Sequence, residues 1–156
     1  MRRSIRKTLL QLAVACAAVL GLSSCASIQR GADEGVVRQV AGLINSGDAK
    51  ALASMSVTPF LVDGEIVPLS ADVAAFWAGI VSAGFRVDGA ALDTGTPVAA
   101  DSFRQFAGTM EVRFWFSRYA KDARIISLSA NGGRHVLLVA RPDWFTWKLL
   151  GFKGPF

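Results

Sequence analysis

Apolar residues recur at helical spacing in the first half of the chain. Asp33 and Glu34 open the first such stretch, because acidic side chains favour the positive end of a helix. Its apolar stripe comprises Val36, Val37, Val40, Leu43 and Ile44. Gly47 can end this helix, and Asp48 can cap a second, short one. A third helix is predicted from Ser70 to Gly84, and its buried face comprises Val73, Phe76, Trp77, Ile80 and Val81.

Period-two alternation and turn signals dominate the second half. Residues 110–117 alternate apolar with polar side chains and predict a strand, as do Phe85 and Val87 more weakly. Residues 125–130 and 135–140 flank an Asn-Gly-Gly turn, a hairpin signature, and residues 144–152 predict the last strand. An Asp63-Gly64 turn predicts a smaller hairpin after the second helix. The prediction is an α+β fold in which N-terminal helices pack on one face of a curved antiparallel sheet.

The N-terminus carries a separate signal. Four basic residues precede an apolar run over residues 9–22, which at 14 residues is shorter than the ~20 that a membrane-spanning helix needs. Leu22-Ser23-Ser24-Cys25 follows this run. The segment resembles a bacterial lipoprotein signal peptide with its lipobox, which implies cleavage before Cys25 and attachment of lipid to that residue. The alternatives are an uncleaved anchor and a secretory signal with a chance cysteine.

This resemblance implies a domain organisation and a location. Residues 1–24 would be the signal peptide, residues 25–34 a tether, and residues 35–156 one α+β domain. The lipidated Cys25 would hold the protein in the bacterial envelope. Ala26 follows the cysteine where Asp usually marks retention in the inner membrane, so the resemblance favours the outer membrane, facing the periplasm.

Charge and cysteine content change when the signal is removed. Four of the 17 Lys and Arg residues lie in residues 1–24, so 13 remain against 12 acidic residues. This near-neutral balance argues against nucleic-acid binding. With Cys16 removed and Cys25 lipidated, His135 is the one remaining His or Cys side chain that is free, which argues against a zinc site. We expect no metal and no cofactor.

The order of predicted elements resembles the nuclear-transport-factor-2-like superfamily, whose cone-shaped fold includes ketosteroid isomerase. Residues 43–48 match the break between its first two helices, Asp63-Gly64 its hairpin, Phe76-Trp77 its third helix, and residues 147–152 its terminal strand. The resemblance covers residues 33–156; another helix-on-sheet domain of cystatin-like type is the alternative. It implies either an isomerase or hydrolase site, or a cone that binds ligands or proteins.

Catalysis finds little support in the residues. An isomerase-type site pairs a carboxylate base with strong donors, and no position matches both. Glu111 is opposite in parity to the apolar set of its predicted strand, and His135 has no visible partner, so we expect no catalytic residue.

Aromatic residues are the remaining candidates for function. Those that would line a pocket or an interface are Trp77, Phe114, Trp115, Phe116, Trp144 and Trp147. The last two strands are apolar on both faces, and helices cover one of them, so the other needs a second protomer, a partner protein or lipid. The sequence thus predicts a non-enzymatic, lipid-anchored protein that binds a partner protein or itself through the sheet. The alternatives are a periplasmic carrier of a small apolar ligand and an isomerase or hydrolase.

Overall fold

The structure is a computed structural model that describes residues 26–130, 134–144 and 146–154. These residues belong to two compact units, Met1–Ala32 and Asp33–Phe156. The predicted signal peptide, Cys25 and the turn at residues 131–133 lie outside the described residues. In the first unit residues 26–32 are helical.

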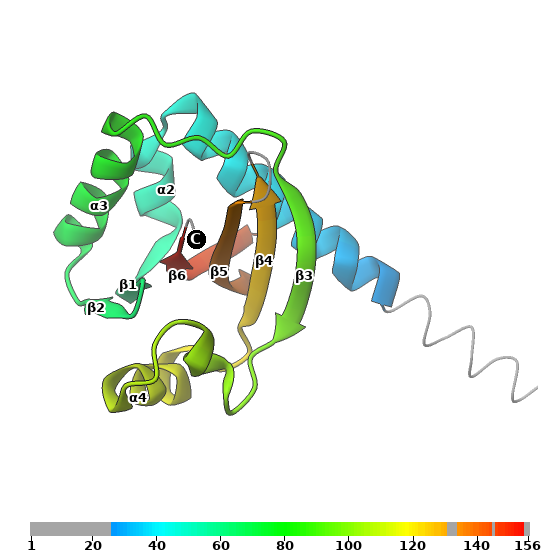
Figure 1. Cartoon of the computed structure of the whole chain (residues 1–156), viewed down its shortest axis with the longest axis vertical. Coiled ribbons are helices and arrows are strands. Elements are labelled where there is room, and N and C mark those ends of the chain that lie inside the picture. Colours follow the sequence, from blue (N-terminus) through cyan, green and yellow to red (C-terminus); the bar gives the residue numbers. More distant parts are fainter. Residues whose placement is uncertain (1–25, 131–133, 145, 155–156) are drawn as a thin grey trace, which may run out of the picture. The chain divides into compact units, whose positions relative to one another are not determined.

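The second unit is α+β, as the pattern of the sequence predicts (Figure 1). A first helix covers residues 33–46. The later helices are α2 (Ala49–Met55), α3 (Ser70–Ser82), the 3-10 helix η1 (Ser102–Gln105) and α4 (Met110–Tyr119). The strands are β1 (Ser56–Val62), β2 (Glu65–Val67), β3 (Ala91–Pro97), β4 (Arg124–Ala130), β5 (Arg134–Asp143) and β6 (Thr146–Lys153).

The six strands form one sheet in the order β2-β1-β6-β5-β4-β3. All neighbours are antiparallel except β1 and β6, which run parallel, so the sheet is mixed rather than antiparallel throughout. The predicted helix start at Asp33-Glu34 is wrong, since residues 26–32 are already helical, whereas the predicted cap at Asp48 and the turn at Asp63-Gly64 are confirmed. Asp48 accepts a hydrogen bond from the Ala51 N–H at the start of α2, and Asp63 and Gly64, both at positive φ, join β1 to β2.

The sheet separates two hydrophobic clusters. The inner cluster lies between one face and the helices at residues 33–46, α2 and α3; it includes Val36, Leu52 and Trp77. The outer cluster lies on the other face under α4 and includes Trp115 and Phe116. Neighbouring strand residues alternate between the clusters, and the clearest pairs are Phe60 and Leu61, Ile126 and Ile125, Leu138 and Val139, and Leu149 and Leu150. Both faces of these strands are therefore apolar, as predicted.

The predicted strand at residues 110–117 is wrong, because this segment forms α4. Thr109 caps the helix by accepting a hydrogen bond from the Val112 N–H. The buried residues Val112, Trp115 and Phe116 follow helical spacing, whereas the alternation counted Val112, Phe114 and Phe116 as one face. The expectation that a partner or lipid must cover the second face of the sheet is also wrong, because α4 of the same chain packs on that face.

Two smaller predictions also differ from the structure. The strand after α3 begins at Ala91 rather than at Phe85, because Gly84 and Gly89 take positive φ and hold the intervening chain in turns. Trp144 lies in the turn between β5 and β6, at φ 51°, and not in a strand.

Candidate functional site

The structure separates the six candidate aromatic residues into buried and exposed groups. Trp77, Trp115 and Phe116 are buried and Trp147 is half-buried. Phe114 is 65% exposed and Trp144 is 94% exposed. The six do not form one site, because they lie on both sides of the sheet and, for Trp144, in the turn between β5 and β6.

Trp77 belongs to an aromatic group inside the inner cluster. Its ring packs edge-on against Phe76 and Phe152, with centroids 4.9 and 5.3 Å away, and lies 6.0 Å from Phe60. Its indole N–H donates to the Ser56 hydroxyl at 2.9 Å. These contacts fill the space between the helices and the sheet, so Trp77 serves the core.

Trp115 has the corresponding role on the opposite face. Its indole N–H donates to the Pro59 carbonyl at 2.9 Å, and its ring packs against Phe116 and Tyr119 with centroids 5.2 and 6.3 Å away. Trp77 and Trp115 therefore fix β1 from its two sides. Neither of them offers surface to a partner.

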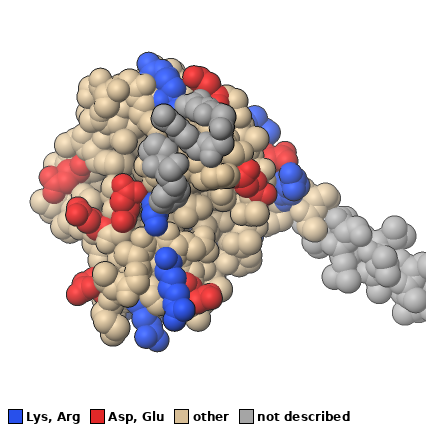
Figure 2. All heavy atoms as spheres, viewed as in Figure 1, with Lys and Arg blue, Asp and Glu red and all other residues tan. Residues whose placement is uncertain are grey.

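The outer surface of α4 carries exposed apolar side chains next to basic ones. Met110 and Phe114, four residues apart, are 71% and 65% exposed, and Arg118 continues the same row. Arg113 and Ser117 form the neighbouring row. We call these five residues the outer ridge of α4. Figure 2 shows Lys and Arg atoms down the lower half of this face, where Figure 1 places α4.

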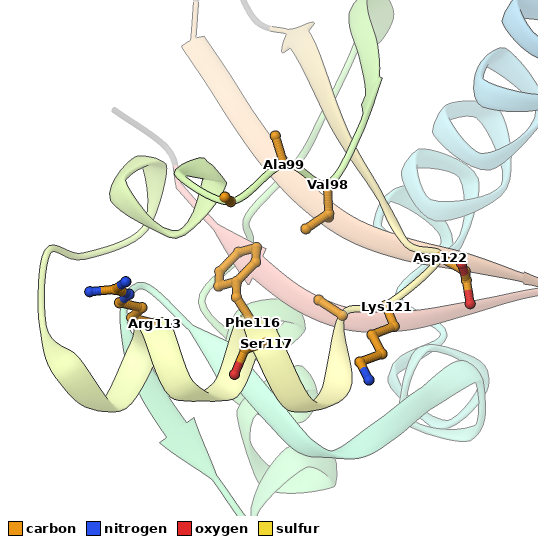
Figure 3. Close-up of a pocket in the computed structure, with 9 residues that line it drawn as sticks. Val98, Ala99, Arg113, Phe116, Ser117, Lys121 and Asp122 are labelled. Carbon is orange, nitrogen blue, oxygen red and sulfur yellow. The ribbon is translucent and has the colours of Figure 1, made fainter.

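Two hollows flank the C-terminal end of α4. The first, of about 330 Å³, lies between α4 and residues 98–100, and Figure 3 shows Phe116 reaching from the helix toward Val98 and Ala99. The second, of about 250 Å³, lies between α4, β1 and β5. Lys121 and Asp122 line both of them.

Three cations line the second hollow: Arg118 from α4, Lys121 from the turn after it and Arg141 from β5. None of the three forms an ion pair with a residue that the structure describes. The other lining residues are the carboxylate Asp122 and the uncharged Val57, Thr58, Pro59, Tyr119 and Leu150. The arrangement combines positive charge with an apolar wall.

A polar cluster occupies the uncovered part of the outer sheet face. Asp93 sits in a β-bulge between Leu92 and Thr94, and such bulges re-aim a side chain. Its Oδ1 accepts a hydrogen bond from the Ser129 hydroxyl at 2.8 Å, and its Oδ2 lies 3.0 Å from His135 Nδ1. Partial burial raises the pKa of Asp93, but the hydrogen bonds from Ser129, His135 and Ser127 and the charge of His135 outweigh it, so the pKa is lowered overall.

This cluster lacks the geometry of a nucleophilic triad. The carboxylate orients His135 through Nδ1, but both serines bind the carboxylate instead of His135 Nε2. The His135 side chain is 55% exposed, so water competes at the ring.

In the described part of the chain, no group of three or more His, Cys, Asp or Glu residues is placed to hold a metal ion. Nor do these residues include a helix with the length and apolarity to span a bilayer.

Sequence reasoning missed Asp93, Arg118 and Arg141. Asp93 has no sequence signal, since a bulge and cross-strand pairs bring it to His135. Arg118 and Arg141 lie 23 positions apart in the chain, and they line the same hollow only because α4 packs over the sheet.

Comparison with known proteins gives no relative: no family model, curated protein or solved structure matches the chain.

Proposed function

We propose that the mature protein is a non-enzymatic lipoprotein of the bacterial envelope, held by lipid on Cys25 in the outer membrane and facing the periplasm. The Leu22-Ser23-Ser24-Cys25 motif after a short apolar run supports the anchor. A protein carrying two or more acyl chains is bound firmly to a bilayer, whereas one chain binds marginally. The domain would then act at a membrane surface.

We further propose that this domain has the cone-shaped fold of the nuclear-transport-factor-2-like superfamily. The order of elements supports this: two helices, a hairpin, a third helix, and then the strands of one curved sheet. η1 and α4, between β3 and β4, are not among the elements on which the resemblance rests. Because α4 packs on the outer face of the sheet, that face is partly covered by the chain itself.

The interior supports a binding protein rather than an isomerase or a ligand carrier. Phe60, Trp77 and Phe152 are fully buried, and the Trp77 ring packs against both phenylalanines where a ligand would lie in the cone. The buried polar residues in the described part of the chain are Asp33 and Ser102, and Asp33 is bound by Arg124. Both oxygens of this carboxylate accept hydrogen bonds from Arg124.

The function would be to bind an acidic partner protein through the outer ridge of α4. The observation that carries this proposal is the exposure of Met110 and Phe114 among cations. Arg113, Arg118 and Lys121 outnumber Glu111 and Asp122 on the exposed side of this helix and the turn after it. A second copy docked on the same face would bring six of these cations together with four carboxylates and leave a net positive charge, so charge favours an acidic partner over self-association.

A photo-crosslinking side chain placed at position 114 tests this proposal in cells. Position 69 is the matched control, because Leu69 is 60% exposed but lies before α3 and outside α4. We expect a crosslink to one acidic protein from position 114, weakened by Arg113→Glu, and no such product from position 69. A crosslink to a second copy of the chain, or identical products from both positions, would overturn the proposal.

A further inference from the structure

The hollow between α4, β1 and β5 has features of a ligand site, and it shares Arg118 and Lys121 with the surface proposed for the acidic partner. Arg118, Lys121 and Arg141 come from three different elements and line one space of about 250 Å³. That is slightly below the range of ~300–1,000 Å³ that holds drug-sized ligands. The size suits one polar group with a short apolar extension.

The charge around the hollow is positive after its negative groups are counted. Asp122 is the one carboxylate among the lining residues. The C-terminal end of α4 adds about half a negative charge. Three cations against these groups leave about one and a half positive charges, which favours an anion.

A cross-strand pair strengthens this preference. Arg141 on β5 lies directly opposite Lys148 on β6, so the two side chains share a face of the sheet. Like charges in this position are destabilising. An anion held beside Arg141 would offset that repulsion.

The wall of the hollow is fixed in position. Trp115 donates to the Pro59 carbonyl and packs against the Tyr119 ring, so two lining residues are held by one buried side chain. Thr58 and Tyr119 both line the hollow, and neither hydroxyl has a hydrogen-bond partner among the described residues. Val57 and Leu150 add an apolar surface.

We propose that this hollow binds a phosphate-type oxyanion carried on an apolar body. Arg118 and Arg141 offer planar guanidinium groups suited to two-point recognition of a phosphate, and Lys121 adds a point charge. Tyr119 and Thr58 donate hydroxyl hydrogen bonds to the remaining oxygens, and the apolar wall contacts the body. A phospholipid headgroup and a soluble organic phosphate share this chemistry.

Calorimetric titration of the full processed protein, purified in a neutral detergent, tests the site with hexyl phosphate and inorganic phosphate. Chloride at matched ionic strength is the control anion. We expect saturable binding of hexyl phosphate, tighter than that of inorganic phosphate. Arg141→Gln and Lys121→Gln are each expected to weaken it about tenfold, the effect of one charge-assisted hydrogen bond.

Lys50→Gln is the matched control variant, because it removes one cation from the exposed surface of α2. It should change the affinity less than about twofold, as expected of a distant charge screened by salt. No saturable binding beyond that of chloride, or an equal loss with Lys50→Gln, would overturn the proposal. Melting temperatures of the variants separate lost binding from lost folding, and Lys121→Gln, in an exposed turn, preserves the test should Arg141→Gln unfold.

Liposomes distinguish the two sources of the oxyanion. The protein is reconstituted in phosphatidylcholine with or without phosphatidylglycerol, and hexyl phosphate is titrated in each. Weaker binding in phosphatidylglycerol identifies the lipid headgroup as a competitor, and unchanged binding identifies a soluble organic phosphate. Met110, Arg113 and Phe114 lie outside this hollow, so the photo-crosslinking result at position 114 and its dependence on Arg113 stand or fail separately.

Discussion

Arg124 binds Asp33 through two hydrogen bonds of 2.7 Å, from Nε to Oδ1 and from Nη2 to Oδ2. Nη2 also donates to the Gly95 carbonyl. The Asp33 side chain is 2% exposed and that of Arg124 is 13% exposed, so the pair lies in the interior. It joins the first helix of the second unit to β4 and β3, which are distant in sequence.

Asp33→Asn is expected to destabilise the fold by about 3–5 kcal/mol, because it leaves the Arg124 guanidinium buried without its counter-charge. Urea unfolding of the processed protein measures the change. Glu34→Gln is the matched control, since it makes the same chemical change one residue later in an exposed pair with Arg38 at 4.0 Å. Such a pair is worth about 0.5 kcal/mol or less. Equal losses in both variants would contradict a structural role specific to Asp33.

The same contact makes Gly95 intolerant of a side chain. A Cβ atom at this position would fall on the Asp33 carboxylate. We expect Gly95→Ala to destabilise the protein, by displacing the ion pair. Gly42→Ala is the control in the first helix, where a Cβ meets nothing within 4 Å, and it should stabilise by about 0.5–1 kcal/mol through helix propensity. A stabilising Gly95→Ala in thermal unfolding would refute the contact.

Two phenylalanines on α4 provide a contrast between core and surface. Phe116 is 5% exposed and packs against Phe106 and Trp115, whereas Phe114 is 65% exposed. We expect Phe116→Ala to cost about 3–5 kcal/mol and Phe114→Ala about 0.5 kcal/mol or less. Chemical denaturation measures both. Similar costs would mean that both residues lie on one face, as the strand interpretation requires.

The sequence was sufficient for elements whose period and end signals agree. Asp48 caps α2 and Asp63-Gly64 turns between β1 and β2, because both depend on local backbone preferences. α4 was mispredicted because a ten-residue segment with apolar side chains at 110, 112, 114 and 116 matches period two, whereas burial selects 112, 115 and 116. Thr109 followed by Glu111 was the available sign of a helix start. The hollow beside Arg118 and Arg141 depends on tertiary packing, which no local pattern encodes.

Asp93 should make stability depend on pH in the acid range. Its pKa lies below the ordinary 3.8 in the folded chain, so the unfolded chain takes up the proton first as the pH falls. The stabilisation from Asp93 is therefore complete above pH 3.8 and is lost as the pH falls through the lowered folded pKa. The difference in unfolding free energy between the parent and Asp93→Asn isolates this group from other carboxylates. It should shrink as the pH falls below about 4.

The matched control for that series is Asp88→Asn, which makes the same chemical change at an exposed residue that has no hydrogen bond or ion pair with a described residue. A difference for Asp93→Asn that grows toward low pH would contradict the hydrogen bonds from Ser129 and His135.

Cys25→Ser should abolish lipid attachment, because the hydroxyl cannot replace the thiol that carries the lipid in the proposed pathway. Unprocessed precursor or unlipidated protein is expected in membrane fractionation and intact mass spectrometry. Cys16→Ser is the matched control: the same substitution inside the apolar run should leave a mass equal to residues 25–156 plus acyl groups, because that thiol leaves with the signal. Processed, membrane-bound Cys25→Ser protein would refute the lipid anchor, while the ion pair of Asp33 and Arg124 and the hollow beside α4 would be unaffected.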